Sequence, residues 1–210
     1  GPVLLFDDFE CDNISNVAPY DDVSAAVDLT GGTPNVTVSE EITNPIGQSP
    51  KSYKLSKDAV NRIEEGWAIT SDRVPREVAV GGQTVNVNFL YETSANYVSG
   101  DIQMFAFLVG PNLLVKLEMI NGGSLTNDLM AAPDVGRFTA PLTLTGDTTS
   151  VRFGWHIATA NANPYDIVVD RIEISTANKI VAPIITEWES FTPVIGSLGA
   201  GGVASSEGRF

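Results

Sequence analysis

Five carboxylates stand in two segments that are far apart along the chain. Asp7, Asp8 and Glu10 follow one apolar run, and Asp166 and Asp170 lie in a second apolar segment. A hard cation such as Ca²⁺ takes several oxygen ligands from carboxylates and backbone carbonyls at about 2.4 Å. These residues can hold such an ion only if the fold brings the two segments together. The alternative is that they are solvated charges at the ends of strands.

Several aromatic residues could bind a sugar, because a pyranose packs its C–H groups against an aromatic face while its hydroxyls bond to polar neighbours. Tyr97, in "SANYVSGD", and Tyr165, in "NANPYD", are expected in loops, where binding residues gather. Trp67 is a third candidate. Tyr91 and Trp155 share the period of their apolar neighbours and are expected in the core instead.

Catalytic chemistry finds little support in the sequence. A glycosidase needs two carboxyl groups about 5–9 Å apart in a cleft. Glu64 and Glu65, in "RIEEGW", are adjacent, and adjacent residues on a strand point to opposite faces. One histidine, His156, and one cysteine, Cys11, exclude multi-histidine metal sites, cysteine zinc sites and an internal disulfide framework. We therefore expect no enzymatic activity, and we expect His156 to point away from Trp155, toward solvent or another subunit.

The charge balance excludes another class of partner. The chain has 12 Lys and Arg residues against 26 Asp and Glu residues, which gives a formal net charge of −14. A phosphate backbone would be repelled, so we expect no nucleic-acid partner. The apolar run Val3–Phe6 is too short for a signal peptide or a membrane span, so we expect no membrane insertion.

Strand patterns recur along the chain, whereas helical periodicity is nearly absent. In "VNVNFLYET", Val85, Val87, Phe89 and Tyr91 alternate with polar residues, which predicts a strand with one face on the core. Similar patterns predict strands at 101–110, 113–120, 150–159 and 166–175. Nine or ten strands at this spacing favour an antiparallel β-sandwich.

The alternation also predicts which side chains fill the core. The candidates are Val85, Phe89, Met104, Leu117, Val151, Phe153, Trp155, Ile172 and Ile174. Residues 123–138 are interpreted as a long loop, whose apolar stretch "LMAAP" would pack against another subunit.

Four segments, "LLFDDFE", "SYKLS", "VNVNFLYETS" and "DIVVDRIEIS", resemble the jelly-roll modules of the carbohydrate-binding-module type. The resemblance covers about residues 3–176 and implies an all-β jelly roll in residues 1–178. It also implies that the first and last strands pair. Asp8, Glu10 and Asp170 would then converge on one edge, and the expectation is a structural Ca²⁺ ion there.

The end of the chain resembles a different group of proteins. "TEWESFTPVIGSLGAGGVASSEGRF" is similar to an opening found in tail-fibre and other appendage proteins of bacteriophages, and Trp188, Phe191 and Pro193 carry the match. Residues 179–210 are therefore expected to be a linker and the beginning of a second β module or assembly segment.

Two functions follow from these resemblances. The first hypothesis is a non-enzymatic bacteriophage virion protein: a trimeric tail-fibre, head-fibre or capsid-decorating module that contacts other virion proteins. It would bind host-surface glycan or act as a spacer. The alternative is a glycan-binding module of a secreted bacterial carbohydrate-active protein. This alternative explains residues 3–176 equally well but leaves the terminal segment unexplained.

Overall fold

A computed structural model of the chain describes residues 3–7, 14–21, 33–69, 84–109, 115–119, 128–143 and 150–176. Within these ranges, side chains are described except at 3–7, 107–109, 115–119, 150–152 and 176. The chain divides into two units, Gly1–Ala177 and Asn178–Phe210, and everything described belongs to the first. The terminal segment with Trp188, Phe191 and Pro193 lies outside the described residues, so its assignment to a second module stays a prediction.

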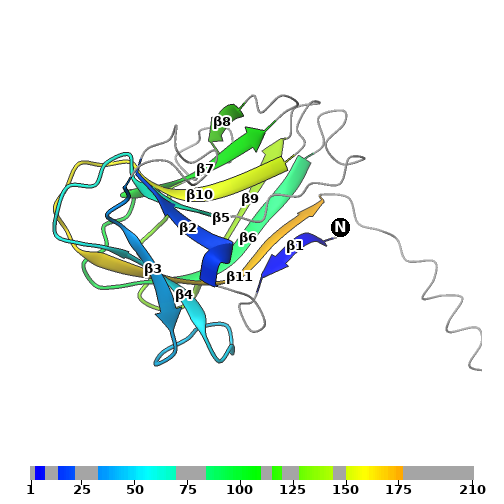
Figure 1. Ribbon diagram of the computed structural model, residues 1–210. Coiled ribbons are helices and arrows are strands. Elements are labelled where there is room, and N and C mark those ends of the chain that lie inside the picture. Colours follow the sequence, from blue (N-terminus) through cyan, green and yellow to red (C-terminus); the bar gives the residue numbers. More distant parts are fainter. Residues whose placement is uncertain are drawn as a thin grey trace, which may run out of the picture. The chain divides into compact units, whose positions relative to one another are not determined.

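The first unit is a sandwich of two antiparallel sheets (Figure 1). Its strands are β1 (Val3–Asp7), β2 (Val17–Tyr20), β3 (Thr37–Glu41), β4 (Ser52–Lys57), β5 (Gly66–Ile69), β6 (Thr84–Thr93), β7 (Ile102–Val109), β8 (Val115–Met119), β9 (Gly136–Thr143), β10 (Ser150–Ile157) and β11 (Tyr165–Thr176), with a short 3-10 helix, η1 (Ile14–Asn16), before β2. Sheet A has the order β3-β4-β11-β6-β9, with β1 also paired to β11. Sheet B has the order β2-β5-β10-β7-β8. The predicted all-β sandwich is confirmed.

The first and last strands pair, as the resemblance implied. Val3 lies opposite Ser175 and Asp7 lies opposite Ile172 in the β1–β11 ladder. Strand β11 pairs with β4 over its first half and with β1 over its second half. The pairing with β6 shifts register between Asp170 and Glu173, where Arg171 has a φ of +51°. This irregularity is a β-bulge, and it falls where β11 changes partner.

The strands predicted at 85–93, 101–110, 113–120, 150–159 and 166–175 are all present, with small shifts at their ends. The interpretation of residues 123–138 as one long loop is wrong at its end, because β9 begins at Gly136 and pairs with β6 along its whole length. Three small residues, Gly136, Ala140 and Pro141, weaken the strand signal in β9 and explain why the pattern missed it.

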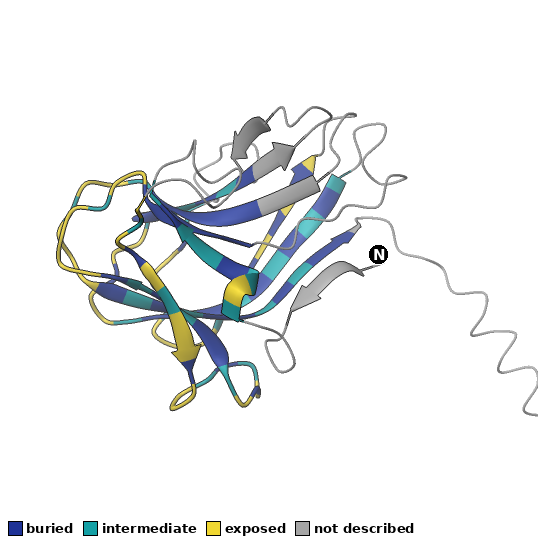
Figure 2. Cartoon of the chain, viewed as in Figure 1, coloured by how far each residue is buried: buried dark blue, intermediate teal, exposed yellow. Residues whose placement is uncertain are grey.

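The core between the sheets is built by the predicted alternation (Figure 2). Strand β6 buries every second side chain, and Phe89 contacts rings from both sheets: Phe138 on β9, and Phe153 and Trp155 on β10. The predicted core residues whose side chains are described are all buried, namely Val85, Phe89, Met104, Phe153, Trp155, Ile172 and Ile174. Trp67 of β5 also crosses the sandwich, since its indole N–H donates to the carbonyl of Thr37 on β3 at 2.8 Å.

Candidate functional site

The outer face of sheet A carries a polar surface that the core alternation leaves toward solvent. Residues opposite one another on neighbouring strands form cross-strand rows, whose side chains lie about 5 Å apart. One row runs through Ser39, Lys54, Val168 and Glu92, from β3 through β4 and β11 to β6. A neighbouring row runs through Thr37, Ser56 and Asp166. Val168 is the apolar position among these polar side chains.

A loop, residues 42–51, joins β3 to β4 and folds back over this face. One oxygen of the Glu41 carboxylate accepts the backbone N–H groups of Thr43 and Asn44, at 3.0 and 2.8 Å, and so fixes the start of the loop. Gly47 turns the chain with a φ of +69°, a conformation that favours glycine. A Cβ at Gly47 would lie 3.1 Å from Leu90 of β6, so the loop rests directly on the sheet.

The buried carboxyl of Asp170 anchors the same loop from below. It accepts hydrogen bonds from the Ser52 hydroxyl and from the Arg171 backbone N–H, both at 2.7 Å. Ser52 in turn accepts the backbone N–H of Ile46, and the Arg171 side chain donates to the carbonyl of Gly47. Burial raises the pKa of Asp170, and the hydrogen bonds from its neighbours oppose that shift.

Between this loop and the end of β6 lies an open groove with a volume of about 360 Å³. Its lining combines hydroxyl, amide, ammonium and carboxylate groups over one apolar side chain. The lining residues are Glu41, Asn44, Lys54, Glu92, Thr93, Ser94, Asp166 and Val168. We call this feature the sheet-A groove.

The charges of the sheet-A groove are only partly compensated within it. Lys54 and Glu41 form an ion pair at 2.6 Å, whose hydrogen bond lowers the pKa of Glu41 and raises the pKa of Lys54. Asp166 accepts a hydrogen bond from the Ser56 hydroxyl at 2.6 Å. Within the described part of the chain, no cationic side chain forms an ion pair with Glu92 or Asp166. One ammonium therefore stands among three carboxylates.

The residues expected to stack on sugar rings lie in the interior instead. Trp67 is 0 % exposed, and Tyr97 and Tyr165 are each 4 % exposed. The rings of Tyr97 and Tyr165 meet edge to face at 5.1 Å, and the Tyr97 hydroxyl donates to the carbonyl of Leu129 at 2.6 Å. A stacking platform needs an exposed ring face, which none of these side chains presents here. The expectation of loop aromatics open to a ligand is corrected accordingly.

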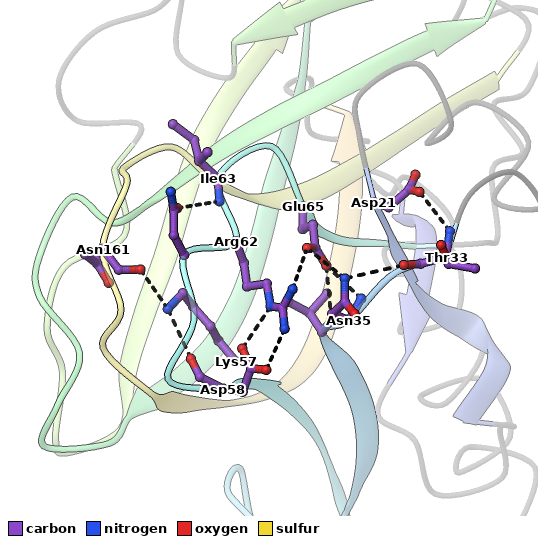
Figure 3. A network of polar contacts seen from close by, with 11 residues as sticks. Asp21, Thr33, Asn35, Lys57, Asp58, Arg62, Ile63, Glu65 and Asn161 are labelled. Atoms are coloured by element: carbon purple, nitrogen blue, oxygen red, sulfur yellow. Dashed lines mark hydrogen bonds and ion pairs between the residues drawn. The ribbon is translucent and has the colours of Figure 1, made fainter.

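Lys57 belongs to a polar cluster that joins the loops at one end of the sandwich (Figure 3). The ammonium of Lys57 lies 5.5 Å from the centroid of the Tyr165 ring and donates to backbone carbonyls on two loops. Asp101 accepts hydrogen bonds from the side chains of Thr159 and Asn161 on the second of these loops. Burial lowers the pKa of Lys57, and the nearby charge of Asp101 opposes that shift. These hydrogen bonds link the loop after β4 to the loop between β10 and β11.

Glu64 and Glu65 lie in the turn before β5 and have separate roles. Glu65 is buried and accepts the backbone N–H groups of Asn35 and Val36, at 2.8 and 3.2 Å (Figure 3). Glu64 is exposed, and its carboxylate lies 3.1 Å from the Nε2 atom of His156. The two glutamates have different partners, but the expectation that they lie on a strand is wrong, because both precede the start of β5 at Gly66.

His156 points to the outer face of sheet B, opposite Trp155, as alternation predicts. The expectation that it faces solvent or a subunit is wrong, because it is 3 % exposed. The Tyr20 hydroxyl lies 2.8 Å from Nδ1, and the ring of Phe105 stacks on the imidazole at 4.7 Å. Burial lowers the pKa of His156, and the hydrogen bond to Glu64 opposes that shift.

The structure describes only part of the expected calcium site. Of its three residues, Asp170 is described and is committed to the 42–51 loop, while Asp8 and Glu10 lie outside the described residues. Among the described side chains, no group of three or more His, Cys, Asp or Glu residues is placed to hold a metal ion. The calcium ion stays a prediction.

Sequence reasoning did not single out the sheet-A groove, although a signal for it existed. Glu92 and Val168 occupy outward positions of strands that contribute predicted core residues, and Lys54 lies between the buried Tyr53 and Leu55 of β4. What the alternation cannot supply is the register between strands, and only the register places these three side chains in one row.

Comparisons with known proteins concern the fold. The sequence matches no protein-family model and no curated protein. Among solved structures, the CBM22-1 xylan-binding domain of Xyn10C from Paenibacillus barcinonensis matches with a TM-score of 0.58 and 12 % identity, over 86 % of this chain and 97 % of that domain. The C-terminal family 22 carbohydrate-binding module of Clostridium thermocellum Xyn10B matches with a TM-score of 0.56 and 10 % identity, over 85 % and 97 % of the two chains. The chain thus has the jelly-roll β-sandwich fold of these carbohydrate-binding modules.

Proposed function

We propose that this chain is a non-catalytic glycan-binding module and that the sheet-A groove is its binding site. The observation that carries the proposal is the groove itself: about 360 Å³ of open space, with hydrogen-bonding side chains around an apolar floor. The fold that the chain shares with xylan-binding and other carbohydrate-binding modules supports the same function. This proposal takes up the alternative of the sequence analysis in place of the virion protein.

The lining of the groove suits the chemistry of a sugar. Each hydroxyl of a pyranose both donates and accepts, and the groove offers acceptors on Glu92 and Asp166 and both kinds of group on Asn44. The side chain of Val168 gives the C–H face of a ring an apolar contact. Charged acceptors form stronger hydrogen bonds than neutral ones, so the carboxylates would dominate recognition.

The site is also largely preformed, which reduces the entropy lost on binding. Strands β4, β6 and β11 supply most of the lining, and the backbone of these strands is fixed by their ladders. The loop that carries Asn44 is held at its start by Glu41 and at its base by Asp170 and Ser52. A glycan chain would therefore meet side chains that are already in place.

Catalysis is not part of the proposal. A glycosidase acid keeps its proton at neutral pH because its carboxyl lies among apolar groups. Glu92 and Asp166 instead stand on an open polar face beside Lys54 and Ser94. The two fold neighbours described above are likewise named as binding modules.

The virion hypothesis depends on residues 179–210, outside the described part of the chain, and remains a prediction. The locations expected from the sequence, virion or secreted, also remain predictions. No helix among the described residues is long and apolar enough to cross a membrane.

Titration calorimetry with a panel of soluble hexasaccharides tests the proposal. The panel contains neutral, amine-bearing and uronic-acid chains, and we expect at least one to bind. The variant Val168→Arg fills the floor of the groove and should abolish that binding. Thr139→Arg places the same side chain at an exposed position of β9, elsewhere on the outer face of sheet A, and should leave binding unchanged.

Two outcomes would overturn the proposal. If the wild-type chain binds no member of the panel, the module is not a glycan binder of this type. If Val168→Arg binds as well as the wild type does, the ligand occupies another surface. Circular dichroism and melting temperature of both variants show whether a loss of binding is a loss of fold.

A further inference from the structure

We propose that the sheet-A groove selects glycans that carry a protonated amine, that is, chains of glucosamine units, over their neutral and anionic counterparts. The inference rests on the proposed function and names the class of ligand for the same site. It follows from two carboxylates of the groove, Glu92 and Asp166, with which no cationic side chain of the described residues forms an ion pair.

The ammonium in the groove is already engaged. Lys54 lies 2.6 Å from Glu41, whose side chain is only 8 % exposed and also accepts two backbone N–H groups. Moving Lys54 toward an anionic ligand would leave that buried carboxylate without its cation, which costs more than an exposed pair returns. The groove therefore has no cation to offer a uronic acid.

Glu92 and Asp166, by contrast, form no ion pair with a cationic side chain among the described residues and can bind a cationic group of a ligand. Glu92 stands directly opposite Val168, and Asp166 lies two residues before Val168 on β11. Diagonal neighbours on adjacent antiparallel strands have side chains about 7–8 Å apart. Because a glutamate side chain is long, both carboxylates can approach one ammonium bound between them, above Val168.

A metal ion fits this position less well than an ammonium does. A hard cation takes six or more oxygen ligands and prefers several carboxylates. The described residues place no group of three or more suitable side chains around a point. An ammonium needs only three acceptors, and the sugar that carries it brings hydroxyls for Asn44 and Ser94 and C–H groups for Val168.

The charge of the whole chain acts in the same direction. At a formal net charge of −14, the protein attracts cationic chains and repels anionic ones over a distance of about 10 Å at 0.1 M salt. This general attraction cannot distinguish one acidic surface from another, so the test must separate it from recognition in the groove.

A matched pair of ligands provides the test: a glucosamine hexamer and its fully N-acetylated form, which has the same backbone but no charge. Calorimetry at a pH where the amine is protonated should show tighter binding of the glucosamine hexamer. Raising the pH until the amine loses its proton should abolish that difference. A uronic-acid hexamer should not bind.

Variants assign the preference to the groove. Glu92→Gln should weaken binding of the glucosamine hexamer about two- to fivefold more than it weakens binding of the N-acetylated hexamer, the range expected for one exposed ion pair. Asp166→Asn should act in the same direction. Glu40→Gln removes an equal charge from an exposed position on edge strand β3, outside the groove, and should change neither affinity.

The outcomes separate the two proposals. Equal binding of both hexamers, or an equal loss in Glu92→Gln and Glu40→Gln, overturns the amine preference while the glycan-binding function stands. If the protein binds only neutral chains, the amine preference is likewise overturned and the glycan-binding function stands. Failure of every ligand to bind overturns both.

Discussion

The ammonium of Lys57 lies 2.7 Å from the carbonyl oxygen of Asn163, on a loop more than 100 residues further along the chain. The same ammonium donates to the carbonyls of Asp58 and Asn161, both at 3.2 Å, and the side chain is 3 % exposed. One buried cation thus fixes the loop after β4 and the loop between β10 and β11.

Replacing Lys57 by methionine should therefore destabilise the module by about 3 kcal/mol, because three carbonyls and Asp101 lose a buried partner. Urea unfolding followed by tryptophan fluorescence measures this loss. Arg62→Met, which removes the ion pairs with Asp58 at 2.7 Å and with Glu65 at 3.7 Å, is the control and should cost clearly less. A loss no larger than that of the control would show that the carbonyls are satisfied in another way.

Asp170 gives the stability of the module a pH dependence. Burial raises the pKa of this carboxyl in the folded state, so its contribution is favourable below the unfolded pKa, about 3.9, and is lost as the pH rises through the folded pKa. Asp170→Asn keeps an oxygen for the Arg171 N–H and cannot ionise. The free energy of unfolding of the variant, relative to that of the wild type, should increase from pH 4 to pH 7. A constant difference across that range would contradict the shift.

Gly66 is required by close packing. A Cβ at this position would lie 2.3 Å from the carbonyl oxygen of Trp155 and 2.6 Å from the Tyr20 hydroxyl. Gly66→Ala should destabilise the fold by about 3 kcal/mol, since backbone and a buried ring must both move. Gly136→Ala is the matched control, because its Cβ meets neighbours only at 3.4 Å and beyond and should change stability little. Equal melting temperatures for the two variants would refute the packing argument.

Calcium is tested by its effect on melting. If Asp8, Glu10 and Asp170 hold a structural Ca²⁺ ion, EDTA should lower the melting temperature and calcium should restore it. Asp8→Asn should remove this response without touching the anchor of the 42–51 loop. Identical melting curves in EDTA and in calcium would exclude the site.

The state of association tests the role predicted for the terminal segment. Light scattering coupled to size exclusion should give the mass of a trimer for the full chain and of a monomer for a chain that ends at Thr176. Monomers in both cases would remove the support for an assembly role of Trp188, Phe191 and Pro193.

How far the sequence predicts the molecule depends on the range of the interaction involved. The alternation in β6 and β10 gave the core, because each side chain there is decided by its immediate neighbours. The burial of Tyr97 could not be predicted from its loop sequence. It depends on the carbonyl of Leu129, 32 residues away, which accepts a hydrogen bond from the Tyr97 hydroxyl. The prediction that His156 faces solvent or another subunit failed for the same reason, since Tyr20 and Phe105 cover its ring from other strands.

The pairing of Val3 with Ser175 has a mechanical consequence. Strands β1 and β11 are antiparallel, so the start of β1 and the end of β11 lie together at one end of their ladder. Tension applied through those two ends would load the hydrogen bonds of this ladder one after another, as a zipper opens, and not all together in shear. Strand β1 would peel away first and at low force, while the pairings of β11 with β4 and β6 and of β6 with β9 stay intact. The module would extend under strain before its groove is disturbed.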